Sequence, residues 1–220
     1  MIPVRDTIQS RHFPFVNIVL ILLNVFFYGI QLSLGGEADT LMIRYALVPA
    51  RYTDPGGVAD FGSGQAIPAL FTFMFIHGSF WHLLGNMWFL YIFGDNVEDR
   101  LGSLSYLLFY LLCGLASGFT HILLNPHSPV PTIGASGAVA GVMGAYFLLY
   151  PRARIVTLVP LLFIPWFIEI PAILFLALWF LMQFLNATLA GDHTSGIAWW
   201  AHIGGFAFGA LIHRIFYRKT

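Results

Sequence analysis

Charged side chains are scarce in this sequence. Only 9% of its 220 residues are Asp, Glu, Lys or Arg, whereas 58% are hydrophobic. A soluble domain carries about 25% charged residues, and a soluble fold of this length has too little interior to bury so much apolar surface. The composition therefore excludes an ordinary soluble domain and predicts an integral membrane protein whose solvent is the lipid bilayer.

The sequence also has no net charge, only one cysteine and no zinc-protease motif. The formal net charge is zero, so no basic excess is available for nucleic acid, and no nucleic-acid partner is expected. The single cysteine, Cys113, excludes an intramolecular disulfide. His77 and His82 have no acid between them, unlike the His-Glu-x-x-His pattern of a zinc protease. Neither a metal nor a cofactor is expected.

Long apolar runs dominate what is present. A membrane span needs about 20 apolar residues, and six segments qualify as candidates: 13–34, 68–93, 104–124, 135–150, 170–189 and 197–217. The first exceeds the core of a signal peptide, about 7–15 residues, and is therefore predicted to be retained. We expect an all-α polytopic bundle of six transmembrane helices, forming a single membrane domain over residues 1–220.

Two further segments complete this organisation. The apolar run 155–168 is short and contains two prolines, so we expect it to lie at the membrane interface and to lead into the fifth span. The loop 35–67 between the first two spans is long and mixes apolar residues with Arg44 and Arg51. It is predicted to lie on the outer side, with an amphipathic segment at the interface.

The positions of basic residues predict the orientation. If the N-terminus is cytoplasmic, only Arg44 and Arg51 face outward, and the inner side holds Arg5, Arg11, Arg100, Arg152, Arg154, Arg214, Arg218 and Lys219. This excess matches the positive-inside rule, so both termini are expected to be cytoplasmic. No Ser- and Arg-rich transit segment is evident, which favours a bacterial plasma (inner) membrane.

Four polar residues interrupt the apolar runs near one predicted face. Ser136 opens the fourth span in Gly134-Ala135-Ser136-Gly137, and His202 lies near the start of the sixth. In the second span, His82 and Asn86 are four residues apart and share a helix face. Polar groups are costly in hydrocarbon and usually mark function. All four are expected at one depth, a few residues below the outer surface.

These residue types suit acyl transfer. A serine becomes nucleophilic when a base removes its proton, which neutral His202 can do for Ser136. The resulting oxyanion needs fixed donors, for which the Ser136 backbone N–H, the Asn86 amide and the His82 imidazole qualify. No carboxylate lies in the fourth or sixth span, and Asp192 belongs to an outer loop. The sequence therefore favours a Ser–His dyad over a triad.

Small residues predict that the fourth and sixth spans pack closely. They recur every fourth residue in both segments, a pattern that lets helix backbones approach in lipid: Gly137, Gly141 and Ala145 in one, Ala201, Gly205 and Gly209 in the other. Taken singly, Ser136 fits such a packing surface, His202 fits a proton relay or transporter site, and Asn86 fits a bridge between helices. Their joint occurrence favours hydrolysis.

At these residues the chain resembles the rhomboid family of intramembrane serine proteases. The resemblance covers about residues 68–217 and rests on three motifs in order: His-x-x-x-Asn at His82–Asn86, Gly-x-Ser-Gly at Gly134–Gly137, and Ala-His with Gly-x-x-x-Gly at Ala201–Gly209. It implies Ser136 as nucleophile, His202 as general base, and His82 and Asn86 as oxyanion stabilisers. It also implies that the substrate is the transmembrane segment of another protein, cut near its outer end.

The resemblance leaves one point open. Many members carry a tyrosine four residues after the nucleophile that stacks on the catalytic imidazole, whereas this chain has Ala140. What orients His202 is therefore undetermined by the sequence. In line with the resemblance, we expect a water-filled recess that loop 190–196 covers as a lid. We also expect the fifth span, 170–189, to act as a lateral gate for the substrate. The alternatives are a catalytically silent relative that binds membrane segments, or a transporter.

Overall fold

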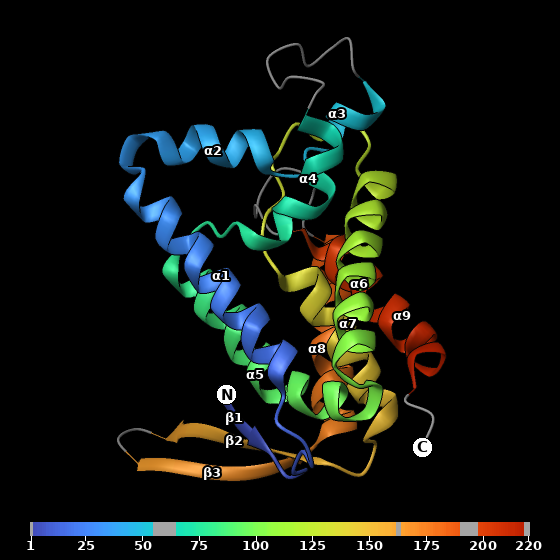
Figure 1. The fold of residues 1–220 in the computed structure, drawn as a ribbon. Helices are drawn as coiled ribbons and strands as arrows, with labels where there is room; N and C mark the ends of the chain where they lie inside the picture. The colour runs from blue at the N-terminus through green and yellow to red at the C-terminus, as the bar shows by residue number, and fades with distance from the viewer. Residues whose placement is uncertain (1, 55–64, 162–163, 190–197, 218–220) are drawn as a thin grey trace.

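The fold is a bundle of helices standing on a small sheet (Figure 1). The computed structural model describes residues 2–54, 65–161, 164–189 and 198–217. Its α-helices are α1 (Phe15–Ser33), α2 (Ala38–Tyr45), α3 (Ala50–Thr53), α4 (Ala66–Thr72), α5 (Phe80–Leu101), α6 (Ser103–Leu124), α7 (Ser136–Leu149), α8 (Ala172–Leu189) and α9 (Trp199–Ile212). Short 3-10 turns are η1 (Gly35–Glu37), η4 (Phe73–Phe75) and η5 (His213–Phe216), and the strands are β1 (Ile2–Asp6), β2 (Arg154–Leu161) and β3 (Ile164–Pro171).

The helices confirm the predicted all-α membrane bundle. Among the described residues, α1, α6 and α8 are each long and apolar enough to cross a bilayer, and α4 with α5 passes the same test as a bent pair. Helices α7 and α9 have 14 residues each and are shorter than a full span. The six-span count therefore stays a prediction.

The second predicted span, 68–93, is wrong in its boundaries. The chain breaks after η4, bends by 79°, and restarts as α5 at Phe80. Ser79 causes the restart, because it is extended and its Oγ accepts the backbone N–H of His82 as an N-cap. The helix then continues to Leu101 through a polar stretch that hydropathy treats as a loop, and Glu98 in that stretch is buried and hydrogen-bonded.

The run 155–168, expected at the interface, forms a hairpin of two strands. Strands β2 and β3 pair antiparallel, with Pro160 opposite Pro165, and β1 pairs antiparallel with β2. Prolines are tolerated at sheet edges and strand ends. Trp166 and Phe167 are exposed on β3, 60% and 55% respectively. The sheet lies below the helices and connects α7 to α8 (Figure 1).

Helix α7 occupies the centre of the bundle. Ten consecutive residues, 137–146, are buried, so no side of the helix faces the surroundings over that stretch. Its contact with α9 is made by backbone: a methyl group added at Gly205 would overlap the carbonyl of Gly137, and one at Gly209 would overlap the carbonyl of Gly141. The two rows of small residues therefore bring the helices into direct contact.

Helix α1 turns polar groups toward the core. Its buried residues include Asn17, Asn24 and Gln31, which recur every seven residues. Asn17 donates to the carbonyl of Leu90 and accepts the Tyr106 hydroxyl at 2.8 Å. Most of the exposed residues of α1 are apolar. A helix with a lipid-like outer face and a polar inner face is thus joined to the bundle by hydrogen bonds.

Both ends of α1 are fixed in the same way. At its start, the Glu98 carboxylate accepts the backbone N–H groups of Val16 and Asn17 at 3.0 and 2.7 Å. Near its end, Gln31 exchanges two hydrogen bonds with the backbone of His77. This second pair holds the bend that precedes α5, and so fixes the approach to His82.

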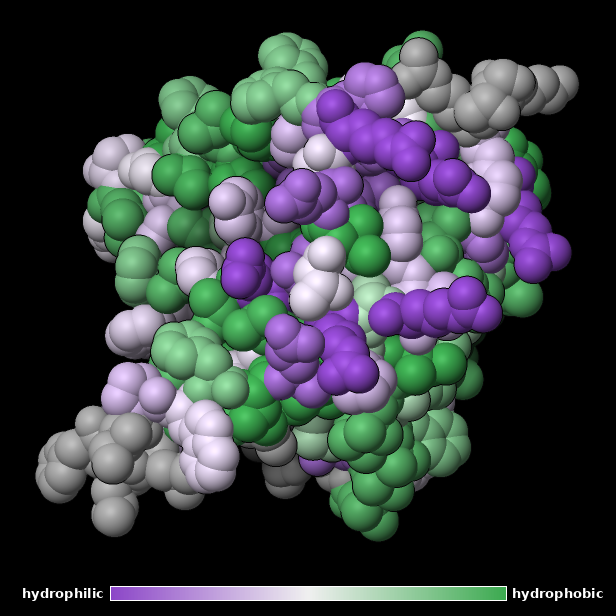
Figure 2. Space-filling model, turned by 90° about the horizontal axis from the view of Figure 1, so that it is seen from below, coloured by the Kyte–Doolittle hydropathy of each residue, from purple (hydrophilic) through white to green (hydrophobic). Residues whose placement is uncertain are grey.

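The end of the molecule that carries the sheet is polar. Figure 2 views this end and shows hydrophilic side chains gathered in its middle, with hydrophobic ones around them. Exposed basic residues belong to its elements and connections: Arg5, Arg11, Arg100, Arg152 and Arg154. Arg44 in α2 and Arg51 in α3 lie at the opposite end (Figure 1). These members of the two predicted groups are thus separated along the bundle, while Arg218 and Lys219 lie outside the described residues.

Strand β1 is hydrogen-bonded to the helices at this polar end. Asp6 accepts a hydrogen bond from the Asn96 amide at 2.9 Å and another from the Tyr146 hydroxyl. Trp88 donates to the carbonyl of Pro3 at 2.6 Å. Burial raises the pKa of the Asp6 carboxyl to about 6. The strand therefore ties α5 and the centre of the bundle together through side chains.

Candidate active site

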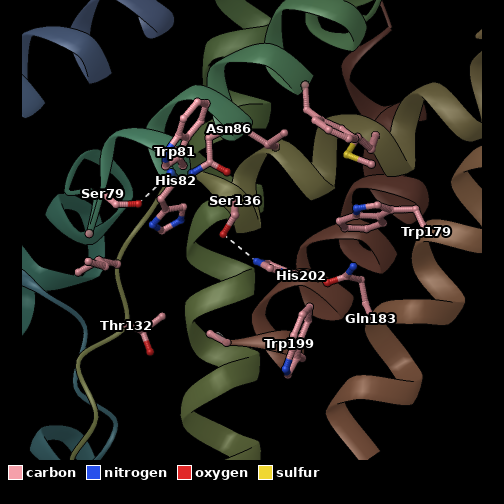
Figure 3. Close-up of a pocket in the computed structure, with 17 residues that line it drawn as sticks. Ser79, Trp81, His82, Asn86, Thr132, Ser136, Trp179, Gln183, Trp199 and His202 are labelled. Carbon is pink, nitrogen blue, oxygen red and sulfur yellow. Dashed lines mark hydrogen bonds between the residues drawn. The ribbon is translucent and has the colours of Figure 1, made fainter. Parts of the chain in front are cut away.

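The predicted polar residues line one cavity of about 560 Å³ (Figure 3). It lies among α5, α7, α8 and α9, and its size is in the range of small-molecule and peptide side-chain sites. Its lining residues are Gly78, Ser79, Trp81, His82, Gly85, Asn86, Phe89, Thr132, Ile133, Ser136, Val139, Met143, Trp179, Gln183, Ala198, Trp199 and His202. Ser136, His202, His82 and Asn86, which come from three separate helices, therefore share one cavity.

The turn before Ser136 requires glycine. Gly134 has a φ of +113°, which only glycine adopts without strain. A side chain there would also crowd the His82 ring, since an added Cβ would lie 2.7 Å from Nε2. The Gly134 N–H donates to the carbonyl of Phe73 at 2.8 Å. The turn therefore places the first residue of α7, Ser136, beside the α5 residues.

Ser136, His202 and Gln183 form a hydrogen-bonded row. The Ser136 Oγ lies 2.8 Å from Nε2 of His202, and Nδ1 of the same ring lies 2.7 Å from Oε1 of Gln183. Figure 3 shows the three side chains pointing toward one another from α7, α9 and α8. The serine can thus lose its proton to an imidazole that is held on its far side.

Two tryptophans flank the His202 ring. Trp179 lies at 6.1 Å between ring centroids with a tilt of 34°, and Trp199 meets the ring edge-on at 6.0 Å. Ala140, at the position where many family members have a tyrosine, is fully buried. Apart from its bond to Ser136 of α7, the His202 ring is therefore contacted by Gln183 and Trp179 of α8 and by Trp199 of α9.

His82 and Asn86 lie on the other side of Ser136 from His202 (Figure 3). The Asn86 side chain is buried, and its Nδ2 has no hydrogen-bond partner in the part of the chain that the structure describes. A buried amide donor without an acceptor is costly. A developing negative charge on a substrate carbonyl would satisfy it.

The starts of three helices meet at the cavity. His82 lies in the first turn of α5, Ser136 begins α7, and His202 lies in the first turn of α9. Helix N-termini carry a partial positive charge and unpaired N–H groups. The cavity therefore favours an anion electrostatically, even though its described lining contains no Asp, Glu, Lys or Arg.

A second, more apolar cavity of about 670 Å³ adjoins the first. It is bordered by α5, α8 and the sheet, and it shares Phe89 and Trp179 with the first cavity. The rings of Phe89 and Phe175 stack across the two helices with centroids 6.5 Å apart. The two cavities therefore share a boundary between α5 and α8.

Sequence reasoning left Gln183 and Asn186 of the fifth span without an assigned role. Gln183 is 6% exposed and bonded to His202, whereas Asn186, three residues on, is exposed. An amide within an apolar span was a visible signal, but hydropathy gives no way to tell which of the two faces inward. The predicted lid, 190–196 with Asp192, lies outside the described residues.

The fold and the cavity define a class: a polytopic integral membrane protein with a serine and a histidine bonded inside its helical bundle. A family model described as Rhomboid domain matches residues 65–219, most of the chain. The chain belongs to the rhomboid family.

Several relatives are similar over parts of their length. Rhomboid-like protein 11, chloroplastic, of Arabidopsis thaliana is 38% identical over 37% of this chain and 30% of its own length. RHOMBOID-like protein 12, mitochondrial, of the same plant is 29% identical over 69% of this chain and 47% of its own. The human presenilin-associated rhomboid-like protein, mitochondrial, is 28% identical over 61% and 34%.

The chain thus aligns with less than half the length of these relatives. Their names place them in chloroplasts and mitochondria, and the bacterial plasma membrane stays a prediction for this chain.

Proposed function

We propose that this protein is an intramembrane serine endopeptidase that cleaves transmembrane segments of other membrane proteins near their outer end. The observation that carries the proposal is the 2.8 Å contact between Ser136 Oγ and His202 Nε2. It lies in a cavity lined by Asn86, whose Nδ2 has no hydrogen-bond partner among the described residues. Membership of the rhomboid family supports it. The whole membrane domain, 1–220, and the bilayer around it are the proposed setting.

The first half of the reaction forms an acyl-enzyme. His202 Nε2 takes the hydroxyl proton as Ser136 Oγ attacks the scissile carbonyl carbon. The carbonyl oxygen becomes an oxyanion, which accepts hydrogen bonds from the Asn86 amide, the His82 imidazole and the Ser136 backbone N–H. The intermediate then expels the amine, to which His202 delivers the proton it holds. One C–N bond breaks and one C–O bond forms.

The second half consumes one water molecule. Water attacks the ester carbon while His202 Nε2 takes a proton from it, and the same donors hold the second oxyanion. Collapse releases the new carboxyl terminus and returns the proton from His202 to Ser136. The polar cavity at the starts of three helices supports this step, because water has to reach Ser136 within an apolar bundle.

The substrate is proposed to enter sideways between α5 and α8. The apolar cavity between these helices suits the side chains of a transmembrane segment, and it adjoins the cavity of Ser136. The small Gly85 and Gly78 beside His82 leave room for an extended backbone near the serine. The proposed gate is therefore α8, with both termini of the enzyme on the cytoplasmic side.

The test uses purified protein in lipid, a model transmembrane substrate and a fluorophosphonate probe. Wild type is expected to cleave the substrate and to label at Ser136. Ser136→Ala should abolish labelling and reduce cleavage on the order of 10⁶-fold. The matched control is Ser117→Ala, since Ser117 is also buried beside α7 but its hydroxyl donates to the Gly114 carbonyl of its own helix.

The outcomes separate the alternatives. Cleavage by Ser136→Ala at the wild-type rate would refute the mechanism. A wild type that binds the segment but neither cleaves nor labels would identify a silent relative. Solute flux in liposomes that depends on His202 and tolerates Ser136→Ala would identify a transporter.

A further inference from the structure

We infer that Gln183 is a positioning residue that completes a row of three, Ser136–His202–Gln183, and fixes which nitrogen of His202 faces the serine. The inference rests on the proposed hydrolase function and deepens it, because the pair expected from sequence becomes a triad with a neutral third member.

The geometry of the row places the two bonds on opposite nitrogens of one ring. Nε2 faces Ser136 Oγ at 2.8 Å and Nδ1 faces Gln183 Oε1 at 2.7 Å. Both distances are those of well-formed hydrogen bonds. The ring is therefore held from both sides, and Trp179 and Trp199 restrict its tilt.

The chemistry of the amide oxygen decides the tautomer. A carbonyl oxygen accepts hydrogen bonds and donates none, so the Nδ1 that faces Oε1 carries the proton of the neutral ring. Nε2 then has a free lone pair directed at the Ser136 hydroxyl, as a general base requires. The other tautomer would place a hydrogen on Nε2 and leave it unable to take the serine proton.

A neutral partner suits this location. A carboxylate in the middle of an apolar bundle carries a large desolvation cost. Glutamine supplies the same acceptor oxygen without a charge. It orients the imidazole and contributes less stabilisation of the imidazolium than an aspartate would.

The surroundings of Gln183 also point to this role. The buried residues of α8 are Ala172, Leu176 and Gln183, which lie along one helix face. Most other residues of this helix face outward, Asn186 among them. The one polar residue on this buried face meets Nδ1 of His202, the ring nitrogen that does not face Ser136.

The experiment compares three variants in the cleavage assay. Gln183→Leu removes the acceptor, Gln183→Glu keeps an acceptor oxygen at the same reach, and Asn186→Leu makes the same amide-to-apolar change on the exposed side of α8. We expect Gln183→Leu to lower kcat by about 10–100-fold, the range seen when a metal-bound histidine loses its hydrogen-bonded partner. KM should stay within about twofold, because no substrate contact is removed.

Two further results are expected. Gln183→Glu should keep kcat within a few-fold of wild type, and Asn186→Leu should equal it. In protein labelled with ¹⁵N-histidine, His202 of wild type should show a protonated Nδ1 and a bare Nε2. The His202→Phe variant assigns that signal, and Gln183→Leu should show a mixture of the two tautomers.

Several outcomes would overturn the inference. Wild-type kcat in Gln183→Leu, a folded but inactive Gln183→Glu, or a protonated Nε2 in the wild-type spectrum would each do so. If Gln183→Leu fails to fold, the wild-type spectrum and Gln183→Glu still decide. Failure of the proposed hydrolase would show instead as cleavage by Ser136→Ala, and the spectrum would then still report the Gln183 bond.

Discussion

The helices that hold the candidate site differ sharply in how they are packed. Helices α7 and α9, which carry Ser136 and His202, touch through backbone, and α7 is buried over ten consecutive residues. Helix α8, which carries Gln183, has 17% of its apolar window buried, against 39% for α6. Ser136 and His202 thus stand on two helices joined backbone to backbone, whereas Gln183 stands on a helix with little buried surface. Stability and access to the site are therefore expected to depend on different residues.

Widening the α7–α9 contact should have the largest effect. Gly205→Val puts a branched side chain against the Gly137 carbonyl, which is backbone and has nowhere to shift. We expect the free energy of unfolding to fall by about 3 kcal/mol, the upper end of the usual overpacking range. Cleavage should be lost as well, because Ser136 and His202 separate. Equilibrium unfolding in detergent and the cleavage assay measure both.

The control is Gly29→Ala on α1. Gly29 is exposed and an added Cβ would meet no atom within 4 Å. This change should be neutral or stabilise by about 0.5–1 kcal/mol. Equal effects of the two substitutions would show that the α7–α9 contact is no tighter than the packing of α1. The proposed difference in packing would then be wrong.

Restraining α8 should stop cleavage without unfolding the protein. Phe89→Cys with Phe175→Cys places thiols on α5 and α8 where two rings now stack, and Cys113→Ala removes the native thiol. With a short, reducible thiol crosslinker, cleavage of the transmembrane substrate should fall below detection, because the substrate cannot pass between the helices. Labelling of Ser136 by the small fluorophosphonate should persist.

Reduction of the crosslink serves as the control and should restore cleavage. Cleavage that proceeds unchanged while the helices are joined would count against α8 as the gate. Such a result would also show that the low burial of α8 has no role in substrate access to Ser136.

A smaller effect is expected where α7 meets the sheet. Burial raises the pKa of Asp6 from 3.8 to about 6, and Asp6 accepts from Tyr146 of α7. An acid with a raised pKa stabilises the fold when protonated, so this contribution is complete below about pH 4 and is lost as the pH rises through about 6. After discounting for partial exposure, the loss should be about 1–2 kcal/mol.

Asp6→Asn tests this assignment. The variant keeps an acceptor oxygen but cannot ionise, so its free energy of unfolding should change little between pH 4 and pH 7. Unfolding curves at several pH values provide the measurement. An unchanged pH slope in the variant would assign the dependence to another group, and the Ser136 labelling rate should be the same in both proteins.

Some features of the structure could be predicted from the sequence and others could not, depending on the kind of signal that each leaves in it. Apolar runs predicted the helices, because burial in lipid selects length and hydropathy. Polar residues within those runs are costly in hydrocarbon and therefore usually functional. That cost led to the prediction that four of them lie together: Ser136, His202, His82 and Asn86.

Other features depend on contacts that hydropathy does not record. The break at 76–79 depends on Ser79 as a cap and on the pairing of Gln31 with the His77 backbone. The pairing of β2 with β1 joins segments about 150 residues apart in the chain. Gln183 could be assigned a role only once the rotation of α8 about its axis was known.

The polar face of α1 has a consequence for how the chain is assembled. Asn17 and Gln31 find their partners on α5, on α6 and in the bend at His77, all of which are synthesised after α1. Each unpaired polar group in hydrocarbon costs several kcal/mol. Helix α1 is therefore poorly suited to lipid until its partner helices have been made. Its insertion is completed by segments that follow it, which makes biogenesis of this protein dependent on helices meeting within the membrane and not only on each helix entering it.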